Sequence, residues 1–210
     1  MTADGPVLNA VFSQASFGST PVQIRFGAVT SFVRPDLLNI TPAGQIDDVF
    51  GLHVGPQNVV NFYFVDTIDF CGGFLAENIV GCGETPGQDF VVESDIAALT
   101  TVAPGDMISF ATQMLGHELG HNLGLDHNPG DFLMNPSING FGTLTEAEVQ
   151  MILASPLIQT EANGQRFVQI NPVLITDGDV PEPSSLALAA GALLLVGLAR
   201  RKRPARMHHA

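Results

Sequence analysis

The segment HELGHNLGLDH, residues 117–127, constrains the fold of this chain more than any other. His117 and His121 are four residues apart, so on an α-helix they project from the same face, about one turn apart. Gly124 is the expected end of that helix, and a left-handed backbone at this glycine would turn the chain sharply. His127 would then swing back toward the first two histidines. The segment therefore predicts a helix, a glycine turn and three converging imidazoles.

Three imidazoles in this arrangement form a candidate zinc site. Imidazole nitrogens bind zinc at about 2.0–2.1 Å, and three protein ligands leave the fourth tetrahedral position for water, which is typical of catalytic zinc. Glu118 lies about 100° round the helix from His117, beside the metal instead of on it. A carboxylate there can accept a proton from zinc-bound water as it attacks a carbonyl, then pass it to the leaving amine. These are the parts needed to hydrolyse a peptide bond.

The spacing HExxHxxGxxH resembles that of the metzincin zinc metalloproteases. The residues that carry the resemblance are His117, Glu118, His121, Gly124 and His127. The family also has a methionine in a tight turn beneath the zinc, and Met134 of DFLMNP is identified as this Met-turn residue. The form HELGHNLGLDH is similar to the matrixin-type branch. We expect no tyrosine ligand, because Asn135 and Pro136 follow where astacin-type and serralysin-type relatives have a tyrosine near the metal.

The resemblance implies an α+β fold: a twisted, mixed and mostly parallel sheet with an active-site helix, a Met-turn, a C-terminal helix and an antiparallel edge strand above the cleft. Segments rich in β-branched and aromatic residues predict strands at 21–26, 58–65, 90–93 and 166–175. Residues 90–93 (FVVE) are the candidate edge strand, to which an extended peptide would add itself. Pro172 argues for an edge position of the last strand.

Two helices are predicted with defined starts. The motif helix begins at Asp106 as N-cap and carries an apolar stripe. The stripe consists of Ile108, Ala111, Leu115, Leu119 and Leu123. The C-terminal helix opens with a capping box formed by Thr145 and Glu148. Residues 35–57 show no sustained period and are predicted to be mostly loop.

The charge distribution argues against a nucleic-acid partner. Residues 1–179 contain three arginines against 20 acidic side chains, a net charge of −17. Nucleic-acid phosphates would be repelled by such a body. The five remaining basic residues stand near the C-terminus: Arg200, Arg201, Lys202, Arg203 and Arg206.

Cys71 and Cys82 bound the glycine-bearing segment CGGFLAENIVGC. A local disulfide fits an exported protein, and two free thiols or a metal pair are the competing interpretations. The ten-residue gap is wrong for a zinc knuckle of the CxxC type. We therefore favour the disulfide.

The C-terminus has a three-part pattern, in which Pro181, Glu182 and Pro183 precede an uncharged run at 184–199 and a basic cluster. The strictly apolar part, 186–199, is shorter than the about 20 residues of a typical bilayer-spanning helix. The run is nevertheless terminal, has no polar face, and ends in a basic block that the positive-inside rule would hold in the cytoplasm. We expect a short transmembrane segment, with the body outside the cytoplasm.

This pattern resembles the PEP-CTERM sorting signal of Gram-negative bacteria. The resemblance implies that a membrane transpeptidase, the exosortase, recognises the tail and cuts it near residues 181–183. The protein would be anchored transiently in the inner membrane and delivered to the cell surface or extracellular matrix. Its first residues, MTADGPVLNAVFSQASFGS, have neither a basic n-region nor a long apolar h-region, and we expect a signal peptide to be missing from this start.

Two units are predicted, a zinc metallopeptidase domain at 1–179 and the sorting signal at 180–210. TDGD at 176–179 is weakly suggestive of a Ca²⁺ site, and a solvated acidic turn is the simpler interpretation. The leading hypothesis is an exported zinc endopeptidase that cleaves polypeptides, with one catalytic zinc ion. The alternative is an exported surface or matrix protein in which the zinc is structural and non-catalytic.

Overall fold

A seven-stranded sheet runs through residues 5–178, the part of the chain that the computed structural model describes. Its order is β1-β10-β4-β8-β7, with β2 and β9 also paired to β10, and a smaller sheet has the order β3-β5-β6. The strands are β1 (Val22–Phe26), β2 (Thr30–Val33), β3 (Asn39–Ile40), β4 (Val59–Val65), β5 (Thr67–Cys71), β6 (Phe74–Ile79), β7 (Gly81–Gly83), β8 (Asp89–Glu93), β9 (Gln159–Thr160) and β10 (Arg166–Thr176). The helices are α1 (Gly5–Val11), α2 (Ala43–Phe50), α3 (Ser94–Ala97), α4 (Phe110–Asn122) and α5 (Glu146–Ala154). The predicted mixed α+β class is confirmed.

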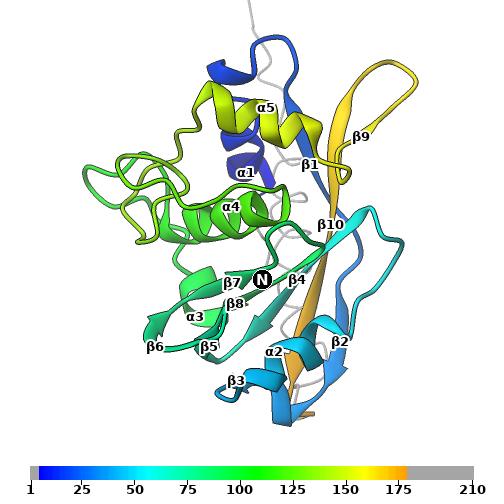
Figure 1. Ribbon diagram of the computed structural model, residues 1–210, viewed down its shortest axis with the longest axis vertical. Helices are drawn as coiled ribbons and strands as arrows, with labels where there is room; N and C mark the ends of the chain where they lie inside the picture. Colours follow the sequence, from blue (N-terminus) through cyan, green and yellow to red (C-terminus); the bar gives the residue numbers. More distant parts are fainter. Residues whose placement is uncertain (1–4, 179–210) are drawn as a thin grey trace, which may run out of the picture. The chain divides into compact units, whose positions relative to one another are not determined.

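The main sheet separates two hydrophobic layers (Figure 1). β4 is buried at every position, and successive side chains of a strand point to opposite faces. Phe62 and Phe64 pack with side chains of α1, α4 and α5. Tyr63 and Val65 pack with α2 and the smaller sheet. Burial on both faces explains why NVVNFYFV is an almost continuous apolar run.

Most ladders of the main sheet are parallel, and β7 runs antiparallel to β8. The strands predicted at 21–26, 58–65 and 90–93 are confirmed as β1, β4 and β8. The edge position predicted for 90–93 is wrong, because β8 lies between β4 and β7 and β7 is the edge strand. An apolar run without polar alternation is typical of such an interior strand.

The edge position predicted from Pro172 is also wrong, since β10 lies between β1 and β4. The carbonyl of Ile170 accepts the N–H of Gly27 on the β1 side, and the backbone groups of alternate residues point to the same side. β1 ends opposite Ile170, and β2 begins opposite Val173. Pro172 therefore faces the gap between β1 and β2, where its missing N–H costs no ladder hydrogen bond.

α4 confirms the predicted motif helix but begins later than expected. Its N-cap is Ser109, whose Oγ accepts the N–H of Thr112, and Asp106 is therefore not the cap. The residues at 107–108 are held in the preceding loop, where both backbone N–H groups donate to the carbonyl of Gly140. These bonds delay the start of the helix.

α5 begins at the predicted capping box of Thr145 and Glu148. The prediction that residues 35–57 are mostly loop is wrong, because this range holds a 3-10 helix (Pro35–Leu37), β3 and α2. Ile46 and Val49 of α2 are buried against the sheet. With only eight residues, α2 is too short to display a sustained helical period.

The chain divides into Met1–Asp177 and Gly178–Ala210. The predicted tail features, Pro181, Glu182, Pro183 and the transmembrane segment at 184–199, lie outside the described residues. The calcium segment at 176–179 also extends past the last described residue and stays a prediction. Across residues 5–178, no helix is both long and apolar enough to cross a bilayer.

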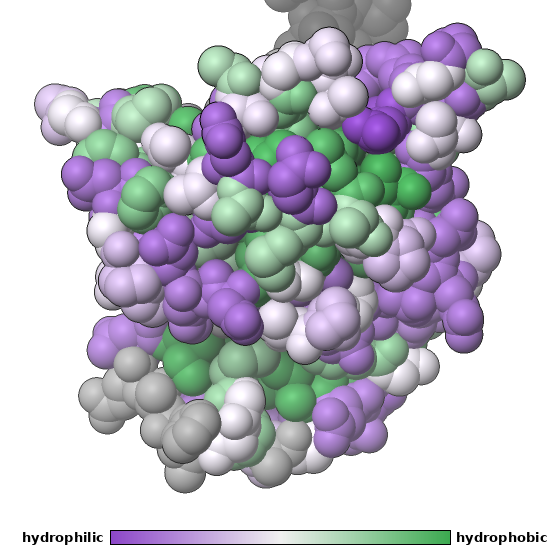
Figure 2. Space-filling view, turned by 45° about the horizontal axis from the view of Figure 1, so that its top comes forward, coloured by the Kyte–Doolittle hydropathy of each residue, from purple (hydrophilic) through white to green (hydrophobic). Residues whose placement is uncertain are grey.

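Hydrophobic residues reach the surface in several places, and Figure 2 shows them as patches between hydrophilic residues on one face. Where the structure describes side-chain burial, the exposed large apolar side chains are Val29, Val33, Leu99, Val102, Met107, Phe110 and Met151. Four of them lie between residues 99 and 110, and the others lie in or beside β2 and in α5.

Gly120 is a position of α4 that tolerates no added volume. A β-carbon there would lie 2.5 Å from Sδ of Met134, which is fully buried and has little room to move. We predict that Gly120→Ala lowers the melting temperature by about 2–6 °C, because overpacking outweighs the gain in helix propensity. Thermal unfolding followed by circular dichroism measures the shift.

The matched control is Gly44→Ala in α2, where a β-carbon would meet no atom within 4 Å. Its melting temperature should stay unchanged or rise slightly. If both variants melted at the parent temperature, the close packing of Gly120 on Met134 would be contradicted.

Candidate metal centre

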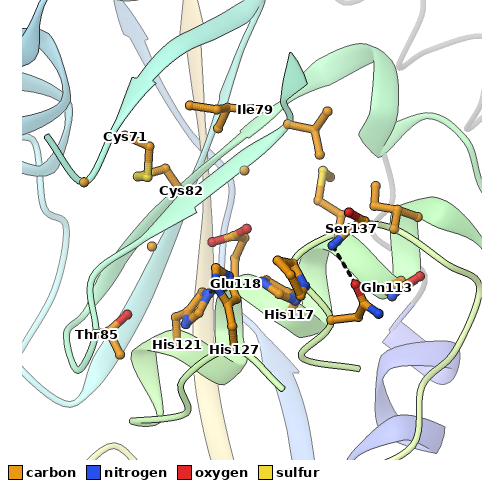
Figure 3. Close-up of a pocket in the computed structure, with 18 of the residues that line it drawn as sticks. Cys71, Ile79, Cys82, Thr85, Gln113, His117, Glu118, His121, His127 and Ser137 are labelled. Carbon is orange, nitrogen blue, oxygen red and sulfur yellow. Dashed lines mark hydrogen bonds between the residues drawn. A yellow bond between two sulfur atoms is a disulfide. The ribbon is translucent and has the colours of Figure 1, made fainter. Parts of the chain in front are cut away.

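The chain reverses after α4 as the sequence predicts. Gly124 has a φ of 99°, a backbone conformation that favours glycine. Its N–H donates to the carbonyl of His121, and the N–H of Leu125 donates to the carbonyl of Gly120. These are the two bonds of a Schellman motif. The reversal brings His127 back to the other two motif histidines, and the three rings form one cluster (Figure 3).

The imidazole nitrogens of this cluster have the spacing of metal ligands. Nε2 of His121 lies 3.0 Å from Nε2 of His117 and 3.2 Å from Nε2 of His127. Nitrogens bound to one tetrahedral zinc ion at 2.0–2.1 Å are about 3.3–3.4 Å apart. The three predicted ligands are therefore together, and they can hold one small metal ion.

Hydrogen bonds on the outer side of two rings determine which nitrogen faces inward. Nδ1 of His117 lies 3.0 Å from the carbonyl oxygen of Leu133, and Nδ1 of His121 lies 2.8 Å from that of Leu125. A carbonyl only accepts, so each Nδ1 is the donor. Burial lowers the pKa of His117 to about 4 and also lowers the pKa of His121, which keeps both rings neutral near pH 7.

The inward Nε2 atoms of these two neutral rings then carry lone pairs. With both rings neutral and each Nδ1 donating, neither Nε2 has a proton to donate, so the two lone pairs that face each other at 3.0 Å repel. A cation bound by both nitrogens removes this repulsion, and fixing ligand imidazoles through Nδ1 is common in metal sites. The donor set of His117, His121 and His127 therefore fits a metal ion.

Glu118 leaves α4 on the side of β7 (Figure 3). Its side chain is buried, and Oε2 has no hydrogen-bond partner among the described residues. Burial raises the pKa of Glu118 to about 8. A cation at the histidine cluster would act in the opposite direction by stabilising the carboxylate. The structure thus places an unpartnered carboxyl group in the wall of the histidine site.

Met134, the predicted Met-turn residue, packs against α4 at Gly120, on the side of the helix away from Glu118. It lies in a turn with Leu133 and is fully buried beside Gly120. Its carbonyl accepts the N–H of Asn128 at 2.8 Å, while the carbonyl of Leu133 faces His117. The turn supports the histidine cluster through its backbone as well as through the methionine side chain.

Asn128 follows His127 directly and ties the reversed segment to α5. Its Nδ2 donates to Oε1 of Glu148 at 3.0 Å. The other oxygen of Glu148 accepts the N–H and the hydroxyl of Thr145 at 2.7 and 2.8 Å. One buried carboxylate is therefore shared between the cap of α5 and the segment that carries the third histidine.

A cavity of about 740 Å³ opens beside the histidine cluster. Its walls include β7 and the segment at 135–138. Of the described side chains that line it, those with a charge, apart from the histidines, are Glu118 and Asp126. The predicted disulfide is confirmed: Cys71 at the end of β5 is joined to Cys82 of β7, and both line the cavity (Figure 3).

Sequence reasoning missed the contribution of β7. Gly81 and Gly83 line the cavity beside Glu118, although no residue type usually associated with catalysis marks this strand. The signal in the sequence is GCG at 81–83, a cysteine flanked by glycines. It indicates one strand face without side chains and an opposite face with a covalent link.

Residues 179–203 match the PEP-CTERM protein-sorting motif, which confirms the resemblance of the tail to this sorting signal. No curated protein and no solved structure matches the chain. The sorting motif implies an exported protein that an exosortase-type enzyme recognises and processes at the membrane.

The bond between Asn128 and Glu148 should affect metal binding. Glu148→Gln leaves one acceptor oxygen where two now serve Thr145 and Asn128, so the segment that carries His127 should loosen. We predict a loss of zinc affinity of up to about tenfold. Competition with a chromophoric chelator measures the dissociation constant.

Glu146→Gln is the matched control, because Glu146 is exposed in the same first turn of α5 and the charge change is identical. Zinc affinity should be unchanged in this variant. Equal losses in the two variants would show that charge alone, and not the bond to Asn128, is responsible.

Proposed function

We propose that the protein is a zinc-dependent endopeptidase of the metzincin type, matrixin-like in its motif, with Glu118 as general base. The observation that supports this most directly is the convergence of three imidazole nitrogens beside one buried carboxyl group without a hydrogen-bond partner for Oε2. Zinc is the metal proposed, because imidazole ligands suit it and three protein ligands leave one position open.

The residues have separate roles in this proposal. His117, His121 and His127 would hold the ion, with Met134 packed against the helix that carries two of them. When bound, zinc would lower the pKa of a coordinated water and polarise the substrate carbonyl. Glu118 would accept a proton at its carboxylate and deliver it to the leaving amine. Burial of this side chain suits it to the task, since bulk water does not compete for the carboxylate.

The edge of the main sheet offers a place for an extended peptide. Within the described part of the chain, β7 pairs with β8 and closes the sheet on that side. A polypeptide substrate would add itself to the outer edge of β7 by backbone hydrogen bonds. Its scissile carbonyl would then lie in the cavity that β7 shares with the histidine cluster.

The sorting motif suggests where the peptidase acts. We place it at the cell surface or in the extracellular matrix of a Gram-negative bacterium, after transient anchoring of the tail in the inner membrane. A disulfide between Cys71 and Cys82 is consistent with an oxidising compartment.

The central test is Glu118→Gln in the full chain. Glutamine keeps the shape of the side chain but does not accept the proton, so kcat for casein should fall by at least about 100-fold while zinc stoichiometry stays the same. Casein hydrolysis and metal analysis of the same preparations measure both. A chelator should abolish cleavage by the parent.

A folded, zinc-loaded parent that cleaves neither casein nor a peptide library would contradict the peptidase proposal. That result would favour the exported surface or matrix protein with structural zinc. A Glu118→Gln variant that keeps parental kcat would contradict the role of Glu118 alone.

Charge predicts a preference for cationic substrates. Residues 1–179 have a net charge of −17, and two of their three arginines are paired, Arg25 with Glu161 and Arg34 with Asp36. Among the residues that the structure describes, no lysine or arginine lines the cavity. A peptide flanked by lysines should show a kcat/KM about tenfold above that of its glutamate-flanked counterpart at low salt, and high salt should shrink the ratio. Equal values at both salt concentrations would contradict this steering.

A further inference from the structure

The edge strand β7 has two unlike faces. Alternation along the strand puts Gly81 and Gly83 on the face toward α4, and Cys82 on the other. Cys82 packs in the layer that contains Tyr63 and Val91. The face toward α4 is therefore bare backbone.

Glu118 packs directly on that bare face. A β-carbon at position 81 would lie 2.8 Å from both Cγ and Cδ of Glu118, and nearer still to Oε1. At position 83 it would lie 3.2 Å from Oε2. Carbon atoms in contact normally lie about 3.5–4.0 Å apart, so no side chain fits at 81 unless Glu118 moves.

Packing is what holds the carboxyl group in place. Among the described residues, no hydrogen bond to Oε2 of Glu118 is present, although this atom is buried. The position of the carboxyl group therefore depends on how far β7 lies from α4. A small shift of the strand would let the side chain move.

The strand itself has few non-covalent anchors. It has three residues, and its ladder partner is β8, through Gly81, Cys82 and Gly83. The disulfide adds a covalent link from Cys82 to Cys71, the last residue of β5 in the smaller sheet. β7 is thus held between β8, β5 and Glu118.

We propose that β7 is a positioning strand for Glu118, in which Gly81 and Gly83 set the place of the carboxyl group and the Cys71–Cys82 disulfide keeps the strand against α4. The catalytic consequence rests on the proposed function, whereas the packing relation does not. Cys71, Cys82 and the two glycines act through Glu118 and touch no reacting atom.

A double-mutant cycle on melting temperature tests the packing relation without any activity assay. At fixed zinc concentration, Gly81→Ala should lower the melting temperature of the parent by about 5 °C. In a Glu118→Ala background the same change should cost less than about 2 °C, because the new methyl group then has room. Gly44→Ala, remote from Glu118, should shift both backgrounds equally.

If Gly81→Ala does not fold, Gly83→Ala gives the cycle a milder contact, of which Glu118→Ala should relieve only the part due to Oε2, since the carbonyl oxygen of Glu118 and Cβ of Phe90 also lie 3.2 and 3.3 Å from the added carbon. Equal costs in the two backgrounds would overturn the proposed packing relation. The cycle is then repeated in a protein in which both Cys71 and Cys82 are replaced by serine. Without the disulfide, β7 can move away from α4, so the difference between the two melting-temperature costs should fall by at least half. An undiminished coupling would overturn the role of the disulfide.

The catalytic consequence is measured in parallel. Gly83→Ala should lower kcat by about tenfold and change KM less, because the added methyl group displaces the base on the inner face of β7 while the outer edge proposed for substrate pairing keeps its backbone groups. An unchanged kcat together with a clear thermal coupling would overturn the catalytic part of the proposal. An inactive parent would instead count against the proposed function, while the thermal cycle would still decide the packing relation.

Discussion

The reversal of the chain at Gly124 is the constraint on which the histidine cluster depends. It returns His127 to the helix and supplies the carbonyl group of Leu125, while the carbonyl group of Leu133 comes from the later turn that holds Met134. These carbonyls accept from the outer nitrogens of the first two histidines and so direct the inner nitrogens toward one point. The turn at Gly124 therefore provides one ligand and orients a second, and the turn at Leu133 orients the third.

The position of Glu118, on the β7 side of the cavity, depends on a different kind of interaction. Glu118 is placed by contact with a strand that has no side chains on the facing surface, and a disulfide holds that strand from behind. Glu118 and two of the three histidines all come from α4. The last turn of this helix is also tied to β8, because Nδ2 of Asn122 donates to the carbonyl of Asp89 at 3.0 Å. Local turn chemistry builds the ligand set, and tertiary packing positions the proposed base.

The sequence predicts those parts of the site that are local. The helix, the turn at Gly124 and the convergence of three histidines follow from eleven consecutive residues, because helical period and a glycine C-cap act over that range. The order of strands depends on partners far apart in the chain, which is why FVVE and Pro172 were assigned to the wrong positions. The contact of Gly81 with Glu118 is of the same long-range kind, and no local pattern predicts it.

The central claim is that the three histidines bind one zinc ion and leave a coordination position open. X-ray absorption at the zinc edge of the full, zinc-loaded chain tests it most directly. Three imidazole nitrogens at about 2.0–2.1 Å and one exchangeable oxygen ligand are expected. A fourth ligand from the protein, or a spectrum unchanged by replacing His127 with alanine, would contradict it.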